Sequence, residues 1–230
     1  PQNSRNWSEI YPLGFLPEFR PNVTDYSAAG GIRADLRGWA TDIGANYGYN
    51  GFDFNLRNTL NSSLGPSLSV PTAPGADGIL GTTDDPGIPN QTSFDAGSLR
   101  RGEFNLSVNL SKSLMLGGLT RPVNVAVGAA FRNESYEVVA GERASWIQGY
   151  HLTSDSSDIA QGGSSVFQGF APSDASKNSR TNVGAYLDLE TNLSDALLAN
   201  IATRVESYSD FGQAFTGKAA VRWQPDPKFV

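Results

Sequence analysis

Hydrophobic and polar residues alternate along residues 101–111 more regularly than anywhere else in the chain. The apolar positions are Phe104, Leu106, Val108 and Leu110, and the polar positions between them are Glu103, Asn105, Ser107, Asn109 and Ser111. Successive side chains of a β-strand face opposite sides of the sheet, so this segment has one apolar side and one polar side. Such a strand fits either the core-facing wall of a soluble β-sandwich or barrel, or the lipid-facing wall of a transmembrane β-barrel.

Six further segments show the same alternation. They cover residues 24–36, 39–56, 123–138, 182–190, 197–206 and 215–223. Turn-forming residues separate them, as at Arg37-Gly38 and at Asn192-Leu193-Ser194-Asp195. The pattern predicts an all-β protein of about seven antiparallel strands in up-and-down order, near or above the roughly 9–11 residues that a tilted strand needs to cross a bilayer.

The connections between these segments alternate in length. Those near residues 37, 112 and 192 are shorter, whereas residues 58–93 and 141–180 form two long stretches rich in Pro, Gly and Ser. Outer-membrane barrels have short periplasmic turns and long extracellular loops, while a soluble sandwich gives no reason for this asymmetry. We therefore interpret residues 1–230 as a barrel segment, with approximately residues 58–93 and 141–180 as extracellular loops.

Composition narrows the function classes. The 230 residues include no cysteine and only one histidine, His151, which leaves little basis for thiolate, imidazole or metal-centred catalysis. The net charge of −6 argues against a nucleic-acid partner. The sequence therefore favours a protein that is not an enzyme.

One loop has the residue types that a calcium site needs. Asp77, Asp84 and Asp85 lie among glycines in residues 74–86, and calcium prefers carboxylate and carbonyl oxygens on a sharply bent backbone. The loop lacks the spacing of an EF-hand, so a solvated acidic turn is the alternative to calcium, the one candidate cofactor.

Aromatic residues in the second long loop are candidates for ligand contacts. Trp146, Tyr150, Phe167 and Phe170 could stack on a sugar or a chelate, or could pack the loop against its neighbours. The sequence favours neither interpretation over the other.

The most specific motif of the chain is Arg204-Val-Glu-Ser-Tyr-Ser-Asp-Phe-Gly212 followed by Thr216-Gly-Lys218. It is accompanied by Ser179-Arg-Thr-Asn-Val-Gly-Ala-Tyr-Leu-Asp-Leu-Glu190 and Phe52-Asp-Phe-Asn-Leu-Arg-Asn58. These motifs resemble the barrel region of TonB-dependent outer-membrane receptors. The resemblance implies a barrel of about 22 strands in the outer membrane of a Gram-negative bacterium. It also implies an N-terminal plug, a scarce ligand such as a siderophore, cobalamin or an oligosaccharide, and energy supplied through TonB.

The sequence departs from that pattern because it contains no plug, no TonB-box segment and too few strands for closure. Unpaired strand edges are costly in lipid, so we expect the chain to be a fragment of a longer receptor. Its partners would then be outer-membrane lipid, the rest of the barrel, the plug, and TonB acting through the missing plug. The alternatives are a soluble β-rich binding or structural module, and a receptor fragment serving as a structural subunit of another assembly.

Overall fold

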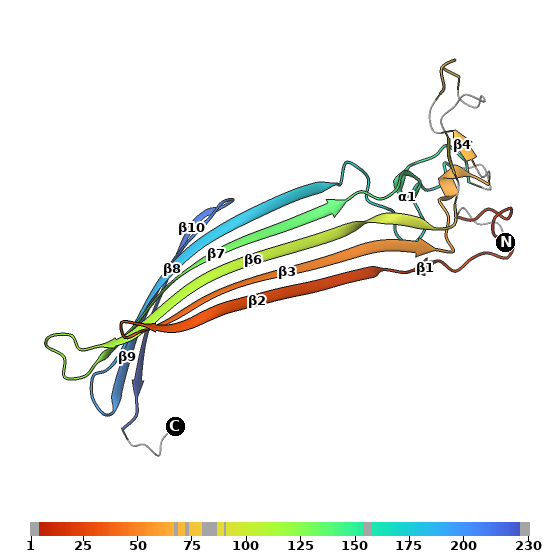
Figure 1. Cartoon of the computed structure of the whole chain (residues 1–230). Helices are drawn as coiled ribbons and strands as arrows, with labels where there is room; N and C mark the ends of the chain where they lie inside the picture. The colour runs from red at the N-terminus through yellow and green to blue at the C-terminus, as the bar shows by residue number, and fades with distance from the viewer. Residues whose placement is uncertain are drawn as a thin grey trace. The chain divides into compact units, whose positions relative to one another are not determined.

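The computed structural model describes residues 5–66, 69–71, 74–79, 87–89, 91–153 and 158–225 (Figure 1). The strands are β1 (Glu18–Phe19), β2 (Asn22–Leu36), β3 (Trp39–Arg57), β4 (Ser69–Pro71), β5 (Gly87–Pro89), β6 (Phe94–Leu114), β7 (Val123–Val139), β8 (Ser176–Asn192), β9 (Leu197–Tyr208) and β10 (Gly212–Trp223). The helices are a 3-10 turn, η1 (Ser62–Leu64), and a single turn of α-helix, α1 (Arg143–Trp146). None of the described helices is long and apolar enough to cross a membrane.

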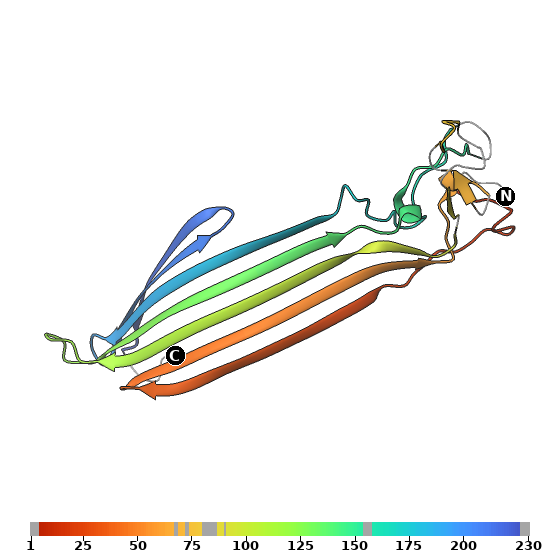
Figure 2. The same ribbon diagram turned by 45° about the horizontal axis from the view of Figure 1, so that its top comes forward.

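The long strands form one antiparallel sheet (Figure 2). Its order is β1-β3-β6-β7-β8-β9-β10, and β2 also pairs with β3. Strands β4 and β5 form a separate two-stranded sheet. Each of the seven long strands is hydrogen-bonded to the next long strand along the chain. The prediction of an all-β chain with about seven long antiparallel strands in up-and-down order is confirmed.

The register at the C-terminal end keeps the two sides of the sheet chemically distinct. Leu187 is opposite Thr203 and Leu189 is opposite Ile201, while Asp188 is opposite Ala202. Residues directly opposite one another in an antiparallel pair point to the same side, so the apolar residues of β8 and β9 share one side. A slip of one residue would mix the two sides.

The connection between β2 and β3 is a two-residue hairpin turn. Arg37 and Gly38 have φ values of 57° and 79°, which is the type I′ geometry that suits the twist of two paired strands. The Asp35 carboxylate accepts a hydrogen bond from the Gly38 N–H at 2.7 Å, and Lys112 Nζ donates one to the Arg37 carbonyl at 2.9 Å. The predicted tight reversal at Arg37-Gly38 is confirmed.

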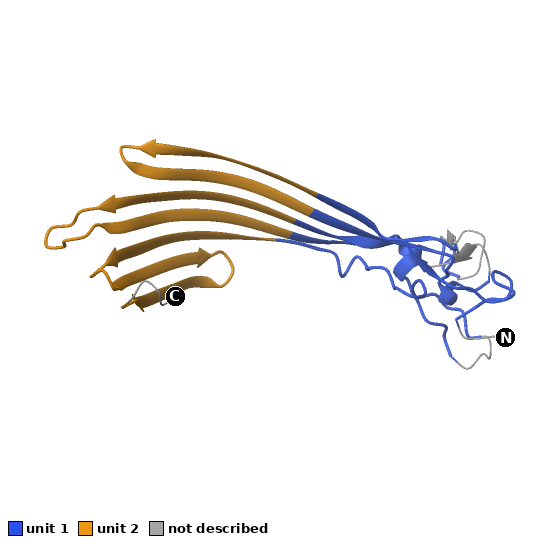
Figure 3. Ribbon diagram, turned by 90° about the horizontal axis from the view of Figure 1, so that it is seen from below, with its two compact units in different colours: residues 1–25, 50–101, 136–178 blue, residues 26–49, 102–135, 179–230 orange. Residues whose placement is uncertain are grey.

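The chain divides into two units, coloured separately in Figure 3. Unit 1 comprises residues 1–25, 50–101 and 136–178, and unit 2 comprises residues 26–49, 102–135 and 179–230. Almost all the buried hydrophobic residues that the structure describes, among them Leu56, Leu64 and Phe94, belong to unit 1, and Val123 is the exception in unit 2. Among the described residues, buried hydrophobic side chains are therefore concentrated in unit 1 and nearly absent from unit 2.

Unit 2 leaves apolar side chains exposed and buries polar ones. Leu187 and Val221 are 39% and 70% exposed, whereas Asn182 and Asn200 are 5% and 9% exposed. The Asn200 side chain donates a hydrogen bond to Asp188 Oδ1 at 2.8 Å on the polar side of the sheet. In unit 2 the apolar side of the sheet does not cover a core, which is the reverse of a water-soluble sheet.

Unit 1 contains a small core built from strand ends and loops. Its hydrophobic cluster consists of Leu56, Leu64, Phe94, Ala96 and Ala144, with Phe54, Ile147 and Phe167 packed against it. Segments that the sequence presents as irregular therefore pack into a defined core.

A buried asparagine joins the two long connections of unit 1. Asn61 Nδ2 donates hydrogen bonds to the carbonyls of Ala144 and Ile147, each at 2.9 Å, and Asn61 Oδ1 accepts one from Ser63 Oγ at 2.6 Å. Ser63 Oγ in turn accepts a hydrogen bond from the Gly149 N–H at 2.8 Å. These bonds satisfy backbone groups that would otherwise be buried without partners.

Candidate functional site

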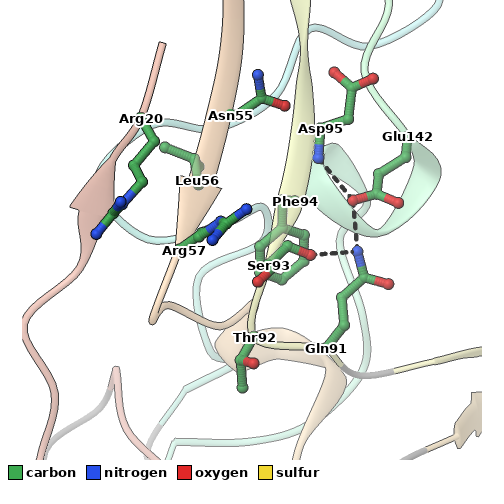
Figure 4. A pocket seen from close by; sticks show the side chains of 10 residues that line it. All are labelled: Arg20, Asn55, Leu56, Arg57, Gln91, Thr92, Ser93, Phe94, Asp95 and Glu142. Carbon is green, nitrogen blue, oxygen red and sulfur yellow. Dashed lines mark hydrogen bonds between the residues drawn. The ribbon is translucent and has the colours of Figure 1, made fainter. Parts of the chain in front are cut away.

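A polar cavity of about 700 Å³ lies in unit 1 (Figure 4). It is lined by residues of β3 and β6, by one residue between β1 and β2, by the segment before β6 and by one residue after β7: Arg20, Asn55, Leu56, Arg57, Gln91, Thr92, Ser93, Phe94, Asp95 and Glu142. Its volume falls within the range of about 300–1,000 Å³ that is typical of small-molecule sites. The cavity is the first candidate for a ligand site.

One wall of the cavity carries two carboxylates that are held by the protein. Glu142 Oε1 accepts hydrogen bonds from the Asp95 N–H at 2.8 Å and from the Gln91 side-chain amide. Asp95 Oδ1 accepts one from the Gly97 N–H at 2.9 Å. Gln91 also donates to the Ser93 carbonyl at 2.7 Å, so these side chains fix the entry of the chain into β6 (Figure 4).

The opposite wall carries two arginines, Arg57 at the end of β3 and Arg20 just after β1. Arg20 follows β1, and its N–H donates a hydrogen bond to the Asn55 carbonyl of β3 at 2.8 Å. Its guanidinium contacts Glu18 Oε2 through Nε at 2.7 Å and Nη2 at 2.6 Å. Arg57, at the end of β3, lies directly opposite Glu18 in the register and is exposed.

The sequence did not identify Arg20, Arg57, Gln91 or Glu142 as site residues. They come from four separate segments without a shared motif, and Arg57 and Gln91 mark the two ends of a stretch with no periodicity. The pairing of β1 with β3 and the Glu142 contacts bring them together. No local signal in the sequence points to this arrangement.

Of the four predicted ligand-binding aromatics, only Phe167 and Phe170 have a ring contact with one another among the described residues. Phe167 stacks on Phe54 with centroids 4.6 Å apart, and Phe170 lies 5.6 Å from both rings, so these two pack in the loop core. Trp146 is tied by its Nε1 to the Gly141 carbonyl at 3.2 Å. Tyr150 is 58% exposed and, among the described residues, has no ring contact with the others. A ligand role for these four residues stays a prediction. Tyr150 is the most exposed of the four.

The proposed calcium loop is described only in part. Asp77 Oδ1 accepts a hydrogen bond from the Ile79 N–H at 2.8 Å, whereas Asp84 and Asp85 lie outside the described residues. Within the described residues, no group of three or more acidic, histidine or cysteine side chains could hold a metal ion. The calcium prediction therefore stays a prediction.

Unit 2 has a second polar region on the sheet. Asn105 of β6 donates a hydrogen bond to Asn46 Oδ1 of β3 at 3.0 Å and accepts one from Arg132 Nε of β7 at 3.1 Å. Ion pairs accompany these bonds: Arg132–Glu103 at 3.9 Å, Arg180–Glu134 at 2.6 Å and Arg204–Glu206 at 2.8 Å. This side of the sheet thus carries closely balanced charge across the four strands β6, β7, β8 and β9, in an arrangement suited to water or to another polar surface.

Comparisons with known proteins place these features in a family. The family model for the TonB dependent receptor-like β-barrel matches residues 2–230. The solved structure of the siderophore receptor PirA from Acinetobacter baumannii is similar over 90% of this chain and 24% of that chain, with 12% sequence identity and a TM-score of 0.51. The chain therefore spans about a quarter of that receptor, and at this identity the likeness shows the fold alone. Among proteins with curated functions, none matches the sequence significantly.

Proposed function

Because this chain belongs to the TonB-dependent receptor-like β-barrel family, we propose that it forms part of the wall of an outer-membrane receptor that takes up a scarce small molecule. The family is one of receptors and transporters rather than enzymes, and its members lie in the outer membrane. In this proposal the chain contributes wall strands and extracellular loops and catalyses no reaction.

The observation that supports the proposal most strongly is the inverted burial in unit 2. Leu187 and Val221 are exposed on the same sheet whose opposite side buries Asn182 and Asn200. Lipid is the environment in which an exposed apolar face is stable, and a water-filled or protein-filled lumen accommodates the charged side. A soluble β-sandwich, the alternative of another class, would need the apolar side to be covered by a second sheet.

Aromatic residues of unit 2 support the same orientation. The ring of Tyr26 in β2 lies 4.9 Å from Tyr49 and 6.1 Å from Tyr47, both in β3. At the turn end, Trp39 follows the β2–β3 turn and has Lys112 Nζ 5.9 Å from its ring. Trp and Tyr favour the two membrane–water interfaces, so we assign these groups to the two edges of the lipid-facing band.

The similar PirA structure is that of a siderophore receptor, and we propose a siderophore, cobalamin or an oligosaccharide as the class of ligand here. The rest of the barrel and a plug would be supplied by sequence outside these 230 residues, and TonB would be a separate partner protein that acts through the plug. A structural subunit within another assembly is the alternative if the chain acts without them.

The proposal predicts that arginine is tolerated on one side of the sheet only. Leu187→Arg places a charge on the apolar side, whereas Ala202→Arg places it on the polar side opposite Asp188. A lipid-facing arginine near the bilayer centre costs about 2–4 kcal/mol, so Leu187→Arg should lower the amount of folded protein in outer-membrane fractions, and Ala202→Arg should lower it much less. Equal recovery of both variants, or a protein that stays soluble and monomeric without detergent, would reject the membrane assignment.

A further inference from the structure

We infer that Lys112 and Arg37, beside Trp39, bind the headgroup phosphate of an anionic phospholipid at the β2–β3 turn of unit 2. This inference rests on the proposed membrane function and names a lipid partner for the apolar side of the sheet. All three residues belong to the unit that is orange in Figure 3.

Lys112 is the single charged residue on the apolar side of the unit 2 strands that the structure describes. The next residue of β6, Ser113, donates a hydrogen bond to Asn124 on the polar side. Because successive residues of a strand alternate, Lys112 points to the other side, together with Leu110 and Leu114. A lysine within hydrocarbon is strongly destabilising, so its place near the strand end fits the border where lipid headgroups lie.

The Lys112 ammonium is held at the turn and keeps donors for an anion. Nζ donates one hydrogen bond to the Arg37 carbonyl at 2.9 Å and lies 5.9 Å from the centre of the Trp39 ring. An ammonium has three N–H donors, and no further acceptor for this one lies in the described part of the chain. Two N–H groups therefore remain for the oxygens of a ligand.

Arg37 adds a second cation at the tip of the same turn. Its side chain is exposed and, among the residues that the structure describes, has no hydrogen-bond or ion-pair partner. The carbonyl of this residue is the acceptor for Lys112, so one backbone position brings the two cations together. A guanidinium and an ammonium together match the oxygens of a phosphate group.

The carboxylates of the β2–β3 hairpin do not neutralise this pair of cations. Asp42 forms an ion pair with Arg33 at 2.6 Å, and Asp35 accepts a backbone N–H of the turn at 2.7 Å. Both carboxylates alternate with the apolar residues of their strands and therefore lie on the polar side of the sheet. The cations Arg37 and Lys112 outnumber Asp35, the one carboxylate here without a cationic partner. This excess of positive charge favours an anionic headgroup over a zwitterionic one.

The acyl chains of the same lipid have an apolar surface beside the site. Leu36, directly before the turn, is 57% exposed, and Leu110 precedes Lys112 on the same side of β6. These residues continue the apolar side that the proposed function places against lipid. With the long loops on the extracellular side, the β2–β3 turn faces the periplasmic leaflet, where phospholipid supplies both a phosphate and hydrocarbon.

The test measures lipid binding by the full-length gene product that carries this chain, purified in detergent, with native mass spectrometry giving the Kd. The probes are phosphatidylglycerol, phosphatidylcholine with the same acyl chains, lipopolysaccharide and the soluble anion sn-glycerol 3-phosphate. The variants are Lys112→Gln, Lys112→Arg and Arg37→Gln, of which the last keeps the carbonyl that Lys112 uses. The matched control is Lys218→Gln, which removes an exposed lysine of β10 on the polar side, opposite Ala202.

We expect phosphatidylglycerol to bind more tightly than phosphatidylcholine, and the soluble anion to bind far more weakly than either. Lys112→Gln and Arg37→Gln should each raise the Kd of phosphatidylglycerol about fivefold, the typical contribution of one basic residue near an anionic membrane surface. Lys112→Arg and Lys218→Gln should hardly change it. If Lys112→Gln does not fold, the comparison of Arg37→Gln with Lys218→Gln decides.

Three results would overturn the inference. The first is an equal effect of Lys112→Gln, or of Arg37→Gln, and the control Lys218→Gln. The second is a soluble anion that binds as tightly as phosphatidylglycerol, which would assign the cations to a ligand in water. The third is a loss of lipopolysaccharide binding in place of phospholipid binding, because the turn would then lie in the outer leaflet.

Failure of this inference can be told apart from failure of the proposed function. A protein that is folded in the outer membrane and binds phosphatidylglycerol independently of Lys112 and Arg37 would refute the lipid site and leave the receptor function intact. A protein that is soluble and monomeric without detergent would refute both. Membrane fractionation of the same variants therefore accompanies the binding measurements.

Discussion

Removal of the Asn61 side chain should open the loop core of unit 1. Asn61 is fully buried and donates to the Ala144 and Ile147 carbonyls, residues that are more than 80 positions away in sequence. In Asn61→Ala the Ala144 carbonyl loses its donor inside the core, whereas the Ile147 carbonyl loses one of two, because it also accepts a hydrogen bond from the Gly163 N–H at 3.1 Å. An unsatisfied buried polar group costs about 1–3 kcal/mol, so the orphaned Ala144 carbonyl together with the second bond lost at Ile147 should cost about 2 kcal/mol.

This cost can be measured as local opening. A loss of about 2 kcal/mol raises the open population roughly thirtyfold. Hydrogen exchange of peptides that cover residues 58–66 and 141–153 should therefore accelerate by about that factor, because exchange reports the free energy of local opening. Asn61→Asp should have a larger effect, since it places a carboxylate against the same two carbonyls.

A surface asparagine provides the control. Asn22 is exposed, lies in the same unit, and donates a single hydrogen bond to Asp53 at 3.2 Å. Asn22→Ala should leave the exchange of the loop peptides unchanged. If Asn61→Ala exchanges no faster than Asn22→Ala, the buried bonds to Ala144 and Ile147 do not hold the two connections together, and the reasoning is wrong.

Two further predictions concern unit 2. A Cβ at Gly128 would lie 2.3 Å from the Tyr186 ring, so Gly128→Ala should lower the free energy of unfolding by about 1–3 kcal/mol in urea titrations; Gly30→Ala, where the space is open, serves as the control, and equal midpoints would contradict the packing. The hydrogen bond and charge of Arg121 lower the pKa of the Asp195 carboxyl in the turn between β8 and β9. A lowered folded-state pKa stabilises the fold above the ordinary carboxyl pKa of 3.8 and loses that effect as the pH falls through the folded value. Arg121→Gln should therefore be less stable than the parent at pH 7, and the difference in stability should shrink as the pH falls below the ordinary carboxyl pKa; a difference that does not shrink in acid would contradict the ion pair.

The strand order and the two sides of the sheet were predictable from local sequence. Alternation with a period of two residues marks each strand wherever it lies, and the turn residues Arg37-Gly38 specify a hairpin without reference to distant contacts. The extent of the strands was less predictable. For example, β6 begins at Phe94 and β8 at Ser176, where polar residues interrupt the alternation.

The loop core and the cavity depended on the tertiary structure. The bond from Asn61 to Ala144, and the contact of Gln91 with Glu142, join residues that are 83 and 51 positions apart. Neither the hydrophobic pattern nor the composition of those segments distinguishes them from solvated loops. Alternation is a property of neighbouring residues and is therefore readable from sequence, whereas the pairing of buried polar groups depends on which distant segments the folded sheet brings together.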